Sequence, residues 1–222
     1  NNVEVKGGKA YAVNIGGGKE NKLTINNSTL TGYAAINVHK DSKNHTIVVD
    51  GSTLNGKNHN DGYHFGAVVV DGINEHNLTI TNSTVTTENL NGVTSKYYDV
   101  IVSAKTTYSV NEGIEVVVRN VYNTRDGLYY IGLPSAVNKA QAGDELKLLC
   151  NTTGAGVVIN KNITIDFDGF TYSFNEGVGS TGTESNGFQI LKGNNVTLKN
   201  GTLNVAESAA NKFYILVQNY AN

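Results

Sequence analysis

The chain has 222 residues, which leaves room for one long domain or two domains of ordinary size. Charged residues make up only 16% of it and Pro occurs once, so charged disordered segments and helical bundles fit poorly and strands with tight turns are favoured. The formal net charge is -2, and Arg119 and Arg125 are the only arginines, which excludes the basic surface that nucleic-acid binding requires.

Two kinds of strand-like segment alternate along the chain. The first is an apolar run that follows Gly or an aromatic residue: YAVNI at 11–15, YAAINV at 33–38, FGAVVV at 65–70, YYDVIV at 97–102, LYYIG at 128–132, FQIL at 188–191 and FYILV at 213–217. The second alternates apolar and polar residues: LTINNSTL at 23–30, IVVDGSTL at 47–54, LTITNSTV at 78–85, VVVRNVY at 116–122, IDFDGFTY at 165–172 and VTLKNGTL at 196–203. Both kinds predict short strands.

The second kind of segment recurs at the length of one coil of a β-helix. Its first apolar residues are Leu23, Ile47 and Leu78 early in the chain, and Ile165 and Val196 later. These spacings fall within the roughly 20 to 50 residues of a solenoid repeat. Two or three short strands per repeat predict a parallel β-helix, in which each coil buries its apolar face only when its neighbours cover it. A β-sandwich of antiparallel strands is the alternative, but two-residue hairpin signals between adjacent apolar runs are scarce.

Each second-type segment contains Asn or Gly at its centre. A sharp bend between two strands needs a residue that tolerates positive φ, and Gly, Asn and Asp do so at the lowest cost. We therefore expect a column of corners at Asn27, Gly51, Asn82, Asn120, Gly169 and Gly201 or Asn200.

The segment LPSAVNKAQAG at 133–143 breaks the strand pattern. Ser135 is a candidate N-cap, small apolar residues follow at helical spacing, and Gly143 is a stop signal, which together predict a short helix at about 135–142. Such a helix would cap the open end of a stack. We therefore divide the chain into residues 1–127, the end of a first stack, and 128–222, a second stack that opens with the helix.

The string GLYYIGLPSAVNKAQAGDELKLL, followed by GVVINKNITIDFDGFTY, resembles the right-handed parallel β-helix modules of large bacterial surface proteins, within the pectate-lyase-like superfamily. The resemblance covers most of 128–222, and 1–127 only through the repeat. It implies an all-β, right-handed parallel β-helix in an extracellular, cell-surface protein. It does not imply one activity, because the superfamily contains lyases, hydrolases, adhesins and tailspikes.

The catalytic motifs of polygalacturonase-like hydrolases are not complete in this chain. The Asn-Thr-Asp motif is interrupted, because Arg125 stands between Thr124 and Asp126 in the string Asn123-Thr124-Arg125-Asp126. No Arg-Ile-Lys motif is present. Asp166 and Asp168 alternate in IDFDGF, so we expect them on one strand face, where they are the best carboxylate pair for acid-base work or Ca²⁺. The alternative, which we prefer, is that one carboxylate binds corner amides and the other is solvated.

All five histidines, His39, His45, His59, His64 and His76, lie between residues 39 and 76. The repeat makes Ile47 and Leu78 neighbours, so we expect His45 and His76 on adjacent coils about 4.8 Å apart. By the same argument His39 lies opposite Asp71. Two histidines with a carboxylate could bind Zn²⁺, but these residues fall in polar loops where histidines are usually solvated, and we expect no metal site.

Five tyrosines around the division between the stacks are the residues that we expect to bind ligand: Tyr97, Tyr98, Tyr122, Tyr129 and Tyr130. Tyr rings stack on sugars while their hydroxyls form hydrogen bonds. The alternative is that about half of the tyrosines there close the end of the first stack against the helix.

We expect a fragment of a longer extracellular protein that is not catalytic and acts as a stalk or adhesin. Its expected partner is a carbohydrate or the surface of a host or neighbouring cell, and we expect no cofactor, with Ca²⁺ as the alternative. No apolar run approaches the roughly 20 residues of a membrane span. A polysaccharide lyase or glycoside hydrolase, with catalytic groups at Asp166 and Asp168 or in the loops at 39–76, is the second hypothesis, and a purely structural spacer is the third.

Overall fold

A computed structural model describes residues 2–58, 66–72, 74–89, 96–182, 184–210 and 212–220. The described chain is all-β apart from the α-helix α1 (Leu133–Lys139) and the 3-10 helix η1 (Glu207–Ala209), and most of its strands are parallel. It divides into two compact units, Asn1–Val118 and Arg119–Asn222, at a point before the boundary that we expected after residue 127.

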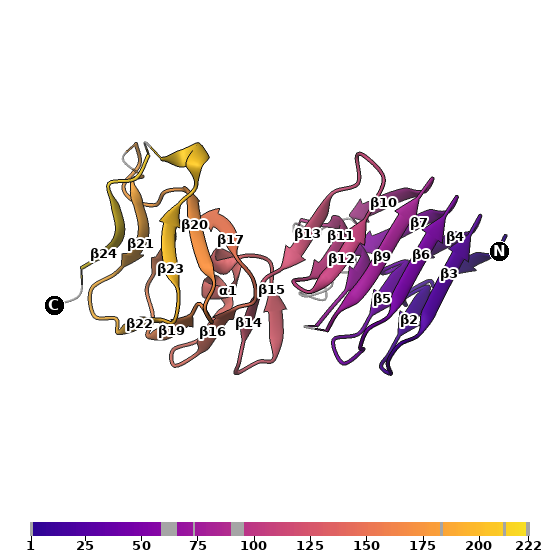
Figure 1. Cartoon of the computed structure of the whole chain (residues 1–222), viewed down its shortest axis with the longest axis horizontal. Coiled ribbons are helices and arrows are strands. Elements are labelled where there is room, and N and C mark those ends of the chain that lie inside the picture. The colour runs from indigo at the N-terminus through magenta and orange to yellow at the C-terminus, as the bar shows by residue number, and fades with distance from the viewer. Residues whose placement is uncertain are drawn as a thin grey trace. The chain divides into compact units, whose positions relative to one another are not determined.

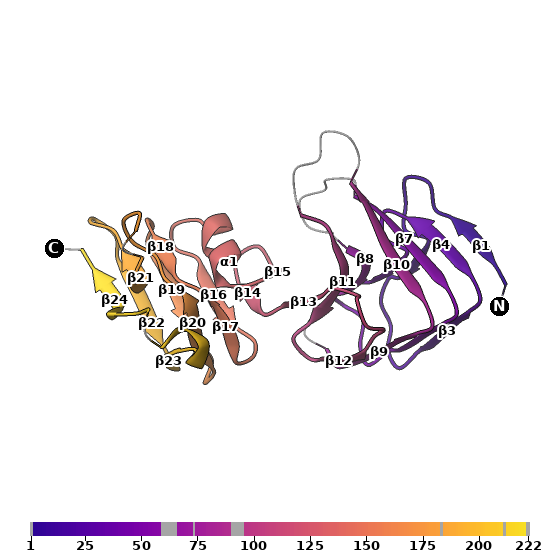
Figure 2. The same cartoon turned by 90° about the horizontal axis from the view of Figure 1, so that it is seen from above.

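The first unit contains three parallel sheets, and successive strands of the chain belong to different sheets. One sheet has the order β1 (Glu4–Lys6), β4 (Thr29–Gly32), β7 (Thr53–Asn58) and β10 (Thr84–Asn89), which lie side by side in Figures 1 and 2. The second has the order β13 (Val116–Arg119), β11 (Tyr98–Ser103), β8 (Gly66–Val70), β5 (Ile36–Val38) and β2 (Val13–Ile15). The third has the order β12 (Thr106–Ser109), β9 (His76–Thr81), β6 (Thr46–Asp50) and β3 (Lys22–Asn26).

Consecutive strands of the first unit belong to different sheets, and the chain returns to each sheet one strand further along. We call the stretch between two such returns a coil. Leu23 pairs with Ile47 and Ile47 with Leu78, which confirms the alignment that the repeat predicted. Stacked parallel sheets of this kind are compatible with a parallel β-helix.

The segment VVVRNVY at 116–122 is not the next member of the second strand type. Tyr108 of β12 takes that place by pairing with Leu78, whereas β13 lies beside β11 in another sheet. The alternation within the segment could not decide between these places, because strands of both sheets put every second residue inside.

The second unit also contains three sheets. The largest has the order β15 (Leu128–Tyr130), β14 (Val121–Asn123), β16 (Glu145–Leu148), β19 (Ile163–Asp166) and β22 (Val196–Lys199). The other two have the orders β17 (Thr152–Ala155), β20 (Thr171–Glu176), β23 (Thr202–Val205) and β18 (Val157–Ile159), β21 (Asn186–Ile190), β24 (Ile215–Asn219). Among the described strand registers, only the pairings of β14 with β15 and β16 are antiparallel, so LYYIG forms a hairpin strand instead of opening a coil.

The register between β19 and β22 differs from the expected one by two residues. The repeat predicted Ile165 opposite Val196, but Val196 pairs with Ile163, and Ile165 pairs with Leu198. A shift of two residues leaves the same side chains on the inner face, which is why the alternation alone could not detect it.

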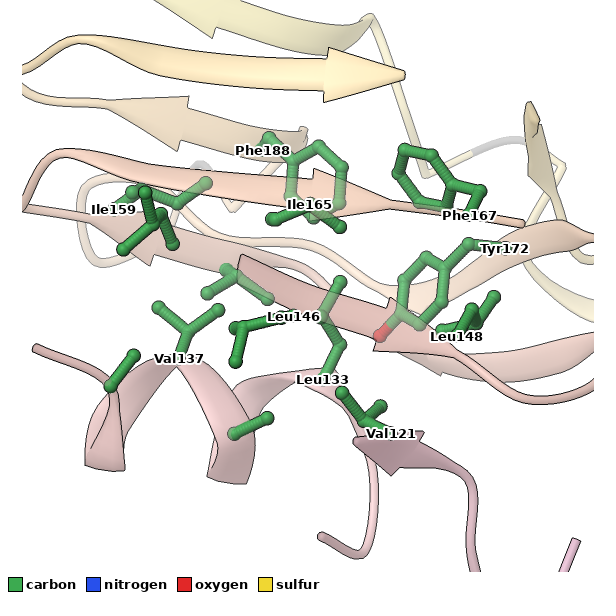
Figure 3. Packing of buried hydrophobic residues seen from close by; sticks show 14 of the residues in the cluster. Val121, Leu133, Val137, Leu146, Leu148, Ile159, Ile165, Phe167, Tyr172 and Phe188 are labelled. Atoms are coloured by element: carbon green, nitrogen blue, oxygen red, sulfur yellow. The ribbon is translucent and has the colours of Figure 1, made fainter. Parts of the chain in front are cut away.

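Helix α1 begins two residues before the expected N-cap at Ser135. Gly132 is the N-cap and Pro134 lies in the first turn, where a residue without an N–H costs no hydrogen bond. Leu133, Ala136 and Val137 are buried on one face of the helix, and the C-cap residue Ala140 is buried as well. In Figure 3, Leu133 and Val137 point from the helix toward Leu146 of β16.

Most of the expected corners have the predicted backbone conformation. φ is 49° at Asn27, 58° at Gly51, 50° at Asn82, 86° at Gly169 and 58° at Asn200. Asn120 is the exception, because it precedes the hairpin strand β14, where its side-chain oxygen accepts a hydrogen bond from the N–H of Gly132 at 2.9 Å. The expected residue with positive φ, Asn or Gly, is therefore found where a coil turns from one parallel sheet to the next.

Each unit has its own apolar core. The first core is built from inward side chains of the three sheets, such as Ile36, Ile47, Leu54 and Leu78. The second adds a group of aromatic rings, Phe167, Tyr172, Phe174 and Phe188, to the face of α1. Each aliphatic side chain buried in these cores contributes about 1.5 to 3 kcal/mol, so stacking is what stabilises the coils.

Candidate functional site

The outer face of the largest sheet in the second unit brings together a predicted carboxylate, Asp166, and two of the tyrosines predicted to bind ligand, Tyr122 and Tyr129. Tyr122 pairs with Tyr129 on one side and with Lys147 on the other, Lys147 pairs with Asp166, and Asp166 with Lys199. These five side chains form one row across β15, β14, β16, β19 and β22, which we call the sheet row. The inner-face neighbours of the row, including Leu146 and Ile165, belong to the apolar core.

Asp166 is the electrostatic centre of the sheet row. Its Oδ2 lies 3.5 Å from Lys199 Nζ and 3.9 Å from Lys147 Nζ, and Lys199 Nζ also lies 3.2 Å from Glu145 Oε1. Its Oδ1 accepts hydrogen bonds from the N–H of Asp168 at 2.9 Å and from Asn200 Nδ2 at 3.2 Å. Burial by itself would raise the pKa of Asp166, but these hydrogen bonds and the charge of Lys199 hold it below its usual value.

A second row runs parallel to the first on the same face. Glu145 pairs with Thr164, and Thr164 pairs with Thr197. A groove of about 150 Å³ lies beside these threonines, lined by Gly143, Asn162, Ile163, Thr164, Asn195 and Thr197. Hydroxyl and amide groups therefore border the charged centre of the sheet row.

Asp168 does not share a strand face with Asp166, contrary to our expectation. The strand β19 ends at Asp166, and Asp168 is an exposed corner residue with a φ of 50°. The bulky Phe167 is buried inside the core, so the chain bends directly after Asp166 and carries Asp168 outward. One carboxylate thus binds corner amides and the other lies in solvent.

The tyrosines of the second unit differ in their surroundings. The rings of Tyr122 and Tyr129 lie 5.0 Å apart between centroids, and Tyr129 is buried whereas Tyr122 is half-buried. Tyr130 points to the opposite face, packs against the apolar core and donates a hydrogen bond from its hydroxyl to Asp126 Oδ2 at 2.7 Å. Burial, followed by this hydrogen bond, raises the pKa of Tyr130. Tyr122 is therefore the tyrosine of this group best placed to meet a ligand on the sheet face.

A buried carboxylate supports the hairpin that carries Tyr122. Asp144 is 2% exposed and receives hydrogen bonds from Arg125 Nε at 2.6 Å, Asn123 Nδ2 at 2.8 Å and the N–H of Gln141 at 2.9 Å. Burial would raise the pKa of Asp144, and these donors outweigh it and lower the pKa. The interrupted motif Asn123-Thr124-Arg125-Asp126 thus has a structural role in the hairpin.

Tyr97 and Tyr98 belong to the first unit. Tyr97 is buried, and its single hydroxyl hydrogen is shared between the carbonyl oxygens of Tyr33 and Gly66, which both lie within hydrogen-bond distance. Tyr98 is half-buried, with Lys96 Nζ 4.7 Å from the centre of its ring. The structure therefore divides the five predicted tyrosines between the two units.

His45 and His76 lie on adjacent coils, and their rings are stacked with 5.5 Å between centroids. Both are buried, with 0% and 1% exposure, and not in the solvated loops that we expected. The Nδ1 of His45 accepts the N–H of Asn21 and the Nδ1 of His76 accepts the N–H of His45. A metal ion at these nitrogens would have to displace a backbone hydrogen bond, because each Nδ1 lone pair is already in use.

His39 and Asp71 do not join the buried pair. His39 is half-buried, and its Nδ1 lies 3.3 Å from Asp41 Oδ2, whereas the buried Asp71 accepts a hydrogen bond from the N–H of Gly72. Across the described ranges, no three His, Cys, Asp or Glu side chains gather in a way that could hold a metal ion. His59 and His64, in the loops at 39–76 that we named as an alternative catalytic region, lie outside the described residues.

Lys147 and Lys199 are site residues that sequence reasoning missed. Lys147 lies between the buried Leu146 and Leu148, and Lys199 follows the partly buried Leu198; this alternation is the signal that would have placed both lysines on an outer face. The sequence does not show the strand register, and this register is what brings both lysines close to the carboxylate of Asp166.

No family model, curated protein or solved structure matches the chain. In the described residues, no helix is long and apolar enough to cross a membrane.

Proposed function

We propose that the chain is part of an extracellular protein of the bacterial cell surface, built as a right-handed parallel β-helix, that acts as a stalk or adhesin and binds carbohydrate on a host or neighbouring cell. The stacked parallel sheets and the sequence resemblance of residues 128–222 support this proposal.

The sheet row is the proposed binding face. The observation that carries the proposal is the cross-strand register, which puts Tyr122 next to Lys147 and in one row with Asp166 and Lys199. A sugar ring can stack its apolar face on an aromatic ring while its hydroxyls bind charged and polar groups nearby. Thr164 and Thr197 add hydroxyl groups at the border of this face.

The protonation states of the sheet row argue against Asp166 as a general acid and against Lys199 as a base. Asp166 is held ionised, and the hydrogen bond of Lys199 to Glu145 raises the pKa of Lys199 and keeps it protonated. A general acid needs a raised carboxyl pKa and a lysine base needs a lowered one. The pKa of Asp166 is lowered and the pKa of Lys199 is raised, so each shift is opposite to the one that catalysis of this kind requires.

The experiment that tests the proposal is a glycan array with and without Ca²⁺, followed by affinity measurements on each retained glycan. The Tyr122→Ala variant is expected to bind roughly fivefold more weakly, because one aromatic contact is worth about 1 kcal/mol. Tyr214→Ala is the matched control, since Tyr214 lies in the same unit, is 86% exposed and is outside the sheet row. An array without any retained glycan would contradict the function, and equal binding by Tyr122→Ala would contradict the site.

A polysaccharide lyase or glycoside hydrolase is the second candidate, favoured only by the exposed carboxylate of Asp168 near Asp166. A reducing-end assay on every retained glycan distinguishes it. Cleavage that is lost in Asp168→Asn would replace the binding proposal with an enzymatic one.

A further inference from the structure

The buried histidine pair of the first unit links three consecutive coils. His45 precedes β6, His76 begins β9, and the residue that donates to His45, Asn21, precedes β3. The N–H of Asn21 is 3.0 Å from His45 Nδ1, and the N–H of His45 is 3.1 Å from His76 Nδ1. The two imidazole rings thus act as hydrogen-bond acceptors between one coil and the next.

This arrangement requires both rings to be neutral. An Nδ1 that accepts an N–H has no proton, so the ring hydrogen is on Nε2, and neither buried Nε2 has a hydrogen-bond partner in the described part of the chain. Protonation of both Nδ1 atoms would break these two hydrogen bonds, because each ring N–H would then face the backbone N–H that now donates to it. It would also place two positive charges in buried rings 5.5 Å apart.

No carboxylate in the described part of the chain compensates for such charges. The charged residues of β3 and of the segments that lead into β3, β6, β9 and β12 are Lys19, Glu20, Lys22, Lys40, Asp41, Lys43, Asp71, Glu75 and Lys105. Within the described residues, no charged side chain forms an ion pair or hydrogen bond with either buried ring. Burial therefore lowers the pKa of His45, and burial together with the charge of His45 lowers the pKa of His76 to about 4, against a smaller opposite effect from the backbone of Ser42.

We propose that the stacked His45–His76 pair is an acid-sensitive latch, which holds three coils of the first unit together at neutral pH and opens in mildly acidic surroundings. The second unit contains no histidine, the side chain whose ordinary pKa lies in this pH range, so we expect it to respond less to the same acidification. The latch is independent of the sheet row and of carbohydrate binding there.

The size of the effect follows from linkage. In the opened state His76 returns to its ordinary pKa of 6.5, so below that pH the opened state takes up a proton that the closed state cannot. The closed state is therefore fully favoured above pH 6.5 and loses its advantage as pH falls toward 4. Between pH 7 and pH 5, His76 alone increases the opening equilibrium roughly 20-fold.

Amide hydrogen exchange of the intact chain at pH 7, 6 and 5, corrected for intrinsic exchange rates, tests the latch. The probes are the amides of Asn21 and His45, which donate to the two rings, and the amide of Thr164 in the second unit is the internal reference. We expect protection at the two probes to fall about 20-fold or more at pH 5, while the reference stays unchanged. Equal behaviour of probes and reference would overturn the proposal.

Two substitutions separate the latch from general acid sensitivity. His76→Asn keeps an acceptor oxygen near the position of Nδ1 but cannot be protonated, so the acid response of the His45 amide is expected to disappear. His39→Asn is the matched control, because His39 is half-buried and lies outside the stacked pair, and this variant is expected to keep the full response. An acid response that persists in His76→Asn, or that is lost in His39→Asn, would contradict the latch, and His45→Asn serves in the same way if His76→Asn does not fold.

Discussion

At the scale of single residues, the corners show how a positive φ limits which residue types can occupy a position. Asn27, Gly51 and Asn82 follow one another at the same corner of three successive coils, and all have φ near 50°. At Gly51 an added Cβ would lie 2.5 Å from Asn27 Oδ1, so the neighbouring coil restricts this position further. The backbone conformation therefore limits this corner to Gly, Asn or Asp, and the contact with the Asn27 side chain favours Gly at position 51.

Gly51→Ala is expected to lower the free energy of unfolding by about 1 to 2 kcal/mol, because the methyl group is strained at positive φ and collides with Asn27. Urea unfolding of the intact chain measures the change. In an Asn27→Gly background the same substitution should cost less, since the collision is removed. An unchanged cost would show that only backbone strain is involved.

A second residue-scale prediction concerns the buried carboxylate of Asp144. Arg125→Gln removes the charge partner of Asp144 and is expected to lower the midpoint of thermal unfolding of the second unit, since the carboxylate remains buried. The double variant Arg125→Gln with Asp144→Asn removes both charges and should recover most of that loss. Thermal unfolding of the three variants compares them, and a double variant no more stable than Arg125→Gln would argue against charge burial as the cause.

At the scale of elements, α1 is a helix of seven residues that is too short to be stable alone. Its apolar face packs on the second core, and Lys161 Nζ donates to the carbonyl oxygens of Val137 and Ala140 at 3.1 and 3.0 Å. A cation at the C-terminus of a helix satisfies the carbonyl groups left unpaired there. Residues outside the helix therefore decide where it ends.

Lys161→Met is expected to reduce protection of the Ala140 amide by roughly fivefold, equivalent to about 1 kcal/mol. Hydrogen exchange at that amide measures the effect, because its N–H bonds to the carbonyl oxygen of Ala136 in the last turn. Lys139→Met is the matched control, since it removes an exposed lysine in the same turn. An equal loss in both variants would indicate a charge effect without the direct hydrogen bonds.

At the scale of the whole molecule, the two separate cores are expected to respond separately to core substitutions. Phe174 is fully buried in the second core and Ile47 in the first. Phe174→Ala should destabilise by about 3 to 5 kcal/mol, and Ile47→Ala by about 2 to 5 kcal/mol. Residue-resolved hydrogen exchange should show each loss in its own unit, and a loss of protection spread equally over both units would contradict separate cores.

The sequence alone determined the strand content, the parallel coils of the first unit and most corners. These features depend on alternation within a segment and on positive φ at single residues, and both are local properties. The same reasoning found Tyr122 and Asp166 as candidate site residues, and it placed His45 beside His76 because the repeat of the first unit was readable in the sequence.

Only the tertiary structure decided which segments pair in the second unit and what lies next to each site residue. The register of β19 and β22, the β14–β15 hairpin and the start of α1 at Leu133 all depend on contacts between distant segments. The sheet row and the burial of the histidine pair follow from such pairings. A two-residue shift keeps every inward side chain inside, so local alternation is compatible with several registers, and packing between segments selects one of them.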